Sequence, residues 1–146
     1  MRHLCGASLI VLLAAMWVPA QSPGNQRDLW IRGIREPLLG PDGSGFFERT
    51  LKDALIPGGA YGISAFRGTV ISSRPENAPT ELIVAVVDET TPELKLRLMG
   101  PYGRPLPKGT IILFNGTPTW FTLNPFQITM EIIEREHFAV VRFGEL

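Results

Sequence analysis

Residues 110–132 read TIILFNGTPTWFTLNPFQITMEI, and this stretch decides the fold class. Thr110–Phe114 is a run of β-branched and large apolar residues, and Phe126, Ile128, Met130 and Ile132 alternate with polar residues. Such alternation is typical of a strand with one face exposed to water. Asn115-Gly116 is a strong signal for a two-residue β-hairpin turn, which predicts that Thr117–Thr122 returns antiparallel beside Thr110–Phe114. Pro118 restricts that returning strand to a sheet edge or a bulge.

The stretches on either side continue the same pattern. The sequence predicts strands at 63–73, where Gly68 marks a bulge or bend, at 81–87, whose two apolar faces indicate a central position, at 94–98, and at 138–143. The three prolines between 101 and 109 exclude regular structure there. We therefore predict a mainly β protein: a small OB-like barrel of five to seven antiparallel strands, with a β-sandwich as the alternative.

One helix is predicted ahead of the strands. Within Phe46–Ile56, the residues Phe47, Leu51, Ala54 and Leu55 form one apolar stripe, and Pro57 follows it. Residues 21–28 are polar and indicate a flexible lead-in, while 29–39 is either a short helix or an arm that packs on the core. The expected division is a signal peptide (1–20), an N-terminal arm and loop (21–45), and a helix-plus-barrel domain (46–146).

The N-terminus has the order of features of a secretory signal peptide. Arg2 and His3 are followed by an apolar stretch that ends in Val18-Pro19-Ala20, which predicts cleavage between Ala20 and Gln21. The apolar run is shorter than the roughly 20 residues of a membrane-spanning helix, so cleavage is favoured over an uncleaved anchor. The expected location is therefore secreted or periplasmic.

The composition after residue 20 restricts the function classes. Cys5, the sole cysteine, precedes the cleavage point, so the mature chain has no disulfide. Without Arg2, 13 basic residues face 14 acidic ones, a net charge of −1. A neutral balance without a run of like charge argues against a general nucleic-acid binder.

Parts of the chain resemble a known group of proteins. Phe66-Arg67-Gly68-Thr69-Val70-Ile71-Ser72-Ser73, Pro107-Lys108-Gly109-Thr110 and Phe121-Thr122-Leu123-Asn124-Pro125-Phe126 are similar to stretches of an uncharacterised, OB-fold-like family of small exported bacterial proteins. The resemblance covers about half of the chain and implies an exported barrel without an assigned activity. It departs from the usual OB-fold because 101–109 cannot form the helix that normally separates the third and fourth strands.

No catalytic or metal-binding pattern stands out. The mature chain has one histidine, His137, in a charged stretch, and no nucleophile motif. Asp88-Glu89 could act as an acid–base pair only if it lay in a cleft with a second polar group in reach. One histidine without a cysteine does not make a zinc site. We predict no enzyme activity, no cofactor and no metal.

The aromatic residues give the best candidate for a binding site. Trp120 and Phe121 are neighbours on one predicted strand, so they face opposite ways, and one of them must leave the core unless Trp30 or the 46–56 helix covers it. We predict a non-catalytic binding or structural module that contacts a protein or envelope component through Trp120, Phe121 and Tyr102. The alternatives are an OB-type nucleic-acid or oligosaccharide binder, which needs Arg67, Arg97, Arg104 and Lys108 on one surface, and a weak hydrolase-like enzyme.

Overall fold

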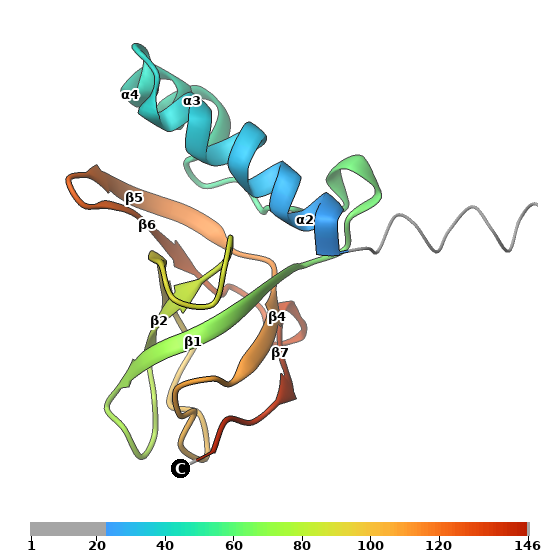
Figure 1. The fold of residues 1–146 in the computed structure, drawn as a ribbon, viewed down its shortest axis with the longest axis vertical. Helices are drawn as coiled ribbons and strands as arrows, with labels where there is room; N and C mark the ends of the chain where they lie inside the picture. Colours follow the sequence, from blue (N-terminus) through green and yellow to red (C-terminus); the bar gives the residue numbers. More distant parts are fainter. Residues whose placement is uncertain (1–22, 146) are drawn as a thin grey trace, which may run out of the picture.

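The computed structural model describes residues 23–145, and the predicted signal peptide (1–20) lies outside this range. The protein is mainly β, as predicted: seven strands form a single mixed sheet in the order β5-β6-β3-β2-β1-β4-β7 (Figure 1). The strands are β1 (Phe66–Arg74), β2 (Glu81–Ala85), β3 (Pro92–Arg97), β4 (Ile111–Phe114), β5 (Thr117–Leu123), β6 (Phe126–Glu131) and β7 (Phe138–Arg142).

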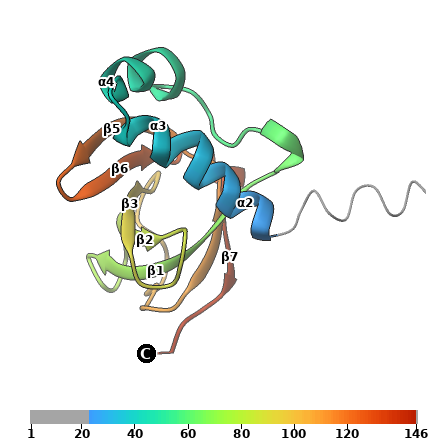
Figure 2. The ribbon, with the colours of Figure 1, turned by 45° about the horizontal axis from the view of Figure 1, so that its top comes forward.

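The sheet is not closed into a barrel, which corrects the OB-like barrel predicted above. In a closed barrel every strand has two neighbours, but here β4 pairs with β1 and β7, so β5 is left with β6 alone. The pairing is also not wholly antiparallel, because β3 and β6 run parallel. The curved sheet is consistent with the β-sandwich alternative (Figure 2).

The predicted hairpin at Asn115-Gly116 is wrong. β4 and β5 do not pair with each other, and neither Asn115 nor Gly116 has the positive φ that a type I′ turn requires. Gly116 instead exchanges two backbone hydrogen bonds with Ile56 (2.8 and 2.9 Å), and the Asn115 side-chain oxygen accepts one from the Gly58 amide (3.1 Å). These contacts with a distant segment direct the chain from one end of the sheet to the other.

Other sequence expectations are confirmed. β2 is central, and Leu94 and Leu96 on β3 are fully buried. β5 is an edge strand with an irregular register between Pro118 and Trp120. One expectation differs: a bulge or bend was predicted at Gly68, but the register shift of β1 lies between Val70 and Ser72. At Gly68 an added Cβ would collide with the Val84 side chain, so this glycine permits close packing.

Two helical segments lie over the sheet: one helix was predicted, and a short helix was one of the two alternatives for 29–39. The first begins at α2 (Pro23–Trp30) and continues without a break through the π-helical turn η2 (Ile31–Arg35) into α3 (Glu36–Leu39), so most of 21–28 is helical rather than a flexible lead-in (Figures 1 and 2). The second consists of α4 (Gly43–Phe46) and η3 (Phe47–Leu51). It starts and ends earlier than the predicted 46–56, because Lys52 and Asp53 leave the helical conformation.

Both helical segments contribute to one hydrophobic core. Trp30, Ile34 and Leu38 recur every four residues along the first segment and are buried, and the Trp30 ring meets Phe66 of β1 edge-on at 5.3 Å between centroids. Phe47 and Leu51 of the second segment are also buried. The helices therefore cover one part of the sheet, and β5 and β7 lie at the two ends of its strand order.

Candidate functional site

The two neighbouring aromatic residues of β5 have opposite environments. Phe121 is half-buried, and its ring lies 5.0 Å from that of Phe47. The second helical segment therefore covers Phe121, which was one of the two covers predicted for this pair. Trp120 points the other way and keeps 63% of its surface exposed. Trp30 does not cover it, because Trp30 is fully buried against Phe66. Trp120 is therefore the uncovered member of the pair.

The exposure of Trp120 coincides with a free strand edge. β5 pairs on one side with β6 and has no strand on its other side within residues 23–145. Asp53 donates its backbone amide to the Pro118 carbonyl (3.0 Å), which occupies the start of that edge. Leu123, at the end of β5, is 51% exposed. An edge strand presents unpaired backbone groups, so it can accept an additional strand.

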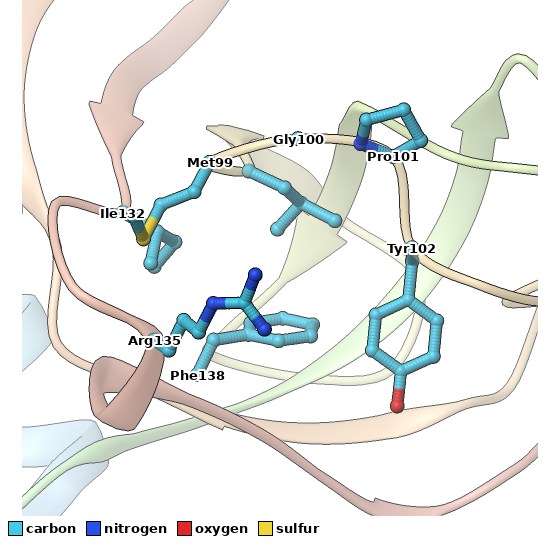
Figure 3. Close-up of a pocket in the computed structure, with 8 residues that line it drawn as sticks. Met99, Gly100, Pro101, Tyr102, Ile132, Arg135 and Phe138 are labelled. Carbon is cyan, nitrogen blue, oxygen red and sulfur yellow. The ribbon is translucent and has the colours of Figure 1, made fainter.

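Tyr102 lies elsewhere, in the long connection between β3 and β4. Its ring meets Phe138 of β7 edge-on at 6.0 Å, and both residues line a cavity of about 330 Å³ (Figure 3). Neither Trp120 nor Phe121 lines this cavity. The structure thus separates the three candidate residues into an exposed tryptophan, a covered phenylalanine and a tyrosine in a pocket.

The four basic residues of the nucleic-acid alternative have different environments. Arg67 borders a second, smaller cavity of about 180 Å³. Arg97 pairs with Glu81 (3.8 Å), and the Arg104 guanidinium stacks 3.6 Å above the Phe143 ring. Two of the four cations are therefore already engaged within the protein, which weakens the nucleic-acid alternative.

Asp88 and Glu89 do border that smaller cavity, together with Arg27, Arg67 and Arg142. The Asp88 carboxylate, however, accepts hydrogen bonds from the Thr90 amide (2.9 Å), the Thr91 amide (2.7 Å) and the Thr91 hydroxyl (2.6 Å). The Thr91 hydroxyl bond, reinforced by the two amides, holds the pKa of Asp88 below its usual value. A carboxylate that has a lowered pKa and already accepts hydrogen bonds within its own turn is a poor proton donor. Asp88 therefore has the arrangement of a residue that stabilises a turn.

The other chemical candidates gain little support. His137 is half-buried in the short η5 helix (Arg135–His137) and does not line either of these cavities. Among the described residues, no group of three or more histidine, cysteine or acidic side chains could hold a metal ion. In the same part of the chain, no helix is long and apolar enough to cross a membrane.

Sequence reasoning missed two groups of residues. Glu93 on β3 is buried, and it accepts a hydrogen bond from Trp30 Nε1 (3.0 Å) and pairs with Arg35 (2.8 Å). The cavity beside Tyr102 is completed by Arg135 and Phe138, more than 30 positions away along the chain. No local pattern marks either group, because each forms only when distant segments fold together.

Comparisons with protein-family models, curated protein sequences and solved structures found no match to this chain. The family resemblance noted above therefore stays a prediction.

Proposed function

We propose that this protein is an exported, non-catalytic binding module that contacts a protein of the cell envelope through the free edge of β5, with Trp120 as its main contact. The observation that carries the proposal is the 63% exposure of a tryptophan on β5, an edge strand that pairs with β6 alone among the strands of residues 23–145. Tryptophan is enriched among the residues that dominate binding energy at protein interfaces.

The proposed partner contributes an extended segment that pairs with β5. Backbone hydrogen bonds along the edge would supply affinity, and the exposed Trp120 and Leu123 side chains would supply selectivity. Because Asp53 occupies the Pro118 carbonyl, pairing is expected along the later part of the strand.

Export is supported by the sequence of residues 1–20, with its basic start, apolar run and Val18-Pro19-Ala20 end. Cell fractionation and N-terminal sequencing of the purified protein test this part. A mature chain that begins at Gln21 outside the cytoplasm is the expected result, and an intact N-terminus on a cytoplasmic protein would contradict it.

Site-specific photo-crosslinking in cells tests the interface. A photoreactive amino acid at Leu123 is expected to give one discrete adduct, whereas the same probe at Leu39, a similarly exposed apolar residue at 48%, serves as the control. Adding Trp120→Ser to the Leu123 probe should abolish the adduct. An adduct that persists in that variant, or that also forms at Leu39, would show that β5 is not the specific surface.

A further inference from the structure

The cavity beside Tyr102 has the size of a small-molecule site. It lies between the connection that follows β3, residues 98–102, and the segment that joins β6 to β7, which contributes Ile132 and Arg135 (Figure 3). Phe138, the first residue of β7, completes the lining. Its volume of about 330 Å³ is near the lower end of the range for ligand pockets, roughly 300–1,000 Å³. A single small molecule would fill it.

Most of the lining is apolar. Tyr102 and Phe138 form one wall through their edge-on contact at 6.0 Å, and Ile132 is a buried residue of the lining. Met99 lies at the rim with 57% of its surface exposed. Its unbranched thioether adapts to different ligand shapes, so this rim can close over an apolar group.

Of the described residues that line the cavity, Arg135 alone is charged, and Figure 3 shows its guanidinium directed into the space between Met99 and Tyr102. Within residues 23–145 it takes part in no ion pair. Its acidic neighbours interact with each other: the hydrogen bond between the two side chains raises the pKa of Glu134. The pKa of Glu136 is lowered by a hydrogen bond with the backbone and, to a lesser extent, by the same bond with Glu134. The guanidinium thus keeps its hydrogen-bond donors available.

We propose that this cavity binds a small organic carboxylate with an apolar body, with the carboxylate paired to Arg135 and the body held between Met99, Tyr102 and Phe138. The planar guanidinium matches a carboxylate through two parallel hydrogen bonds. A neutral apolar molecule leaves this donor pair unused, and a phosphate group, with its higher charge, calls for more cations than the single one present. This site is independent of the β5 edge, because Trp120 does not line the cavity.

The test follows the Met99 methyl group by NMR in the purified protein labelled at its methionine methyls. Met130 lies in the core of β6 with no exposed surface and is the internal reference. The probes are 3-phenylpropanoate and octanoate, each compared with the alcohol that replaces its carboxylate by a hydroxyl-bearing carbon. A Met99→Leu variant assigns the signal.

A saturable shift of Met99 by at least one carboxylate, with Met130 unmoved and the matching alcohol bound about tenfold more weakly, is the expected result. Arg135→Gln should weaken carboxylate binding about tenfold, whereas Arg142→Gln, at an exposed arginine outside the cavity, should leave it unchanged. Absence of a Met99 shift with both carboxylates would overturn the proposal. Equal binding of acid and alcohol, or unchanged binding in Arg135→Gln, would also overturn it.

Discussion

Removing the Arg35 side chain is expected to destabilise the protein by leaving a buried charge without its partner. The Glu93 side chain is 6% exposed, and its two oxygens contact Arg35 Nε at 2.8 Å and Trp30 Nε1 at 3.0 Å. In Arg35→Met the carboxylate keeps only the neutral indole donor. This contact is also the charged link between the first helical segment and the sheet, so its loss weakens the attachment of that segment.

The size of the effect follows from the burial of the two partners. Breaking a fully buried ion pair costs about 3–5 kcal/mol. The Arg35 side chain is 40% exposed, so water offsets part of this cost and we expect a loss of about 2 kcal/mol in the free energy of unfolding. Glu93→Gln keeps an acceptor for Trp30 and removes the buried charge, so it should cost only about 1 kcal/mol.

Urea denaturation at neutral pH, followed by circular dichroism, measures these differences in a double-mutant cycle. The combined Arg35→Met and Glu93→Gln variant should be no less stable than Arg35→Met alone, which corresponds to a coupling energy of at least about 1 kcal/mol. Arg32→Met is the matched control on the same helix, because its pair with Asp28 is largely exposed, and it should cost about 0.5 kcal/mol or less. A coupling energy near zero would refute the view that Arg35 compensates a buried carboxylate.

Three further predictions concern single side chains. In acrylamide quenching, the emission that disappears in Trp30→Phe should be blue-shifted and protected from the quencher, because the Trp30 side chain is 0% exposed. The emission that disappears in Trp120→Phe should be red-shifted and freely quenched, because Trp120 is 63% exposed. Equal quenching of the two would contradict the assigned environments. Asp88→Asn should lower stability at neutral pH by about 1 kcal/mol. Folding lowers the Asp88 pKa, so this stabilisation is present above the unfolded pKa of about 4 and is lost as the pH falls through the lower folded pKa. The difference in the free energy of unfolding between wild type and Asp88→Asn should therefore narrow in acid denaturation curves. A difference that stays constant with pH would argue against this role of Asp88. Gly68→Leu should destabilise the protein by more than about 2 kcal/mol in the same urea assay, because its Cβ collides with Val84, and a neutral result would show that β1 and β2 can move apart.

Local sequence patterns predicted the strands well because each strand carries its own period. Leu94 and Leu96 are buried between Lys95 and Arg97, as alternation required, and Pro118 lies on an edge strand because it lacks an amide to donate. These properties depend on residues one or two positions apart.

The arrangement of those strands could not be predicted in the same way. Asn115-Gly116 is a favourable hairpin sequence, yet in the fold Gly116 contacts Ile56 and Asn115 contacts Gly58 in place of a hairpin turn. The parallel pairing of β3 with β6 likewise joins segments about 30 residues apart.

The residues of the candidate site show the same difference between what local sequence and what tertiary packing determine. The sequence by itself determined that Trp120 and Phe121 must face opposite ways, because neighbouring residues of a strand always do. Only the tertiary structure decided that Phe47 covers Phe121 and leaves Trp120 exposed, and that Arg135 and Phe138 join Tyr102 around one cavity. Local geometry fixes the direction of a side chain, whereas its surroundings depend on packing between segments far apart in the chain.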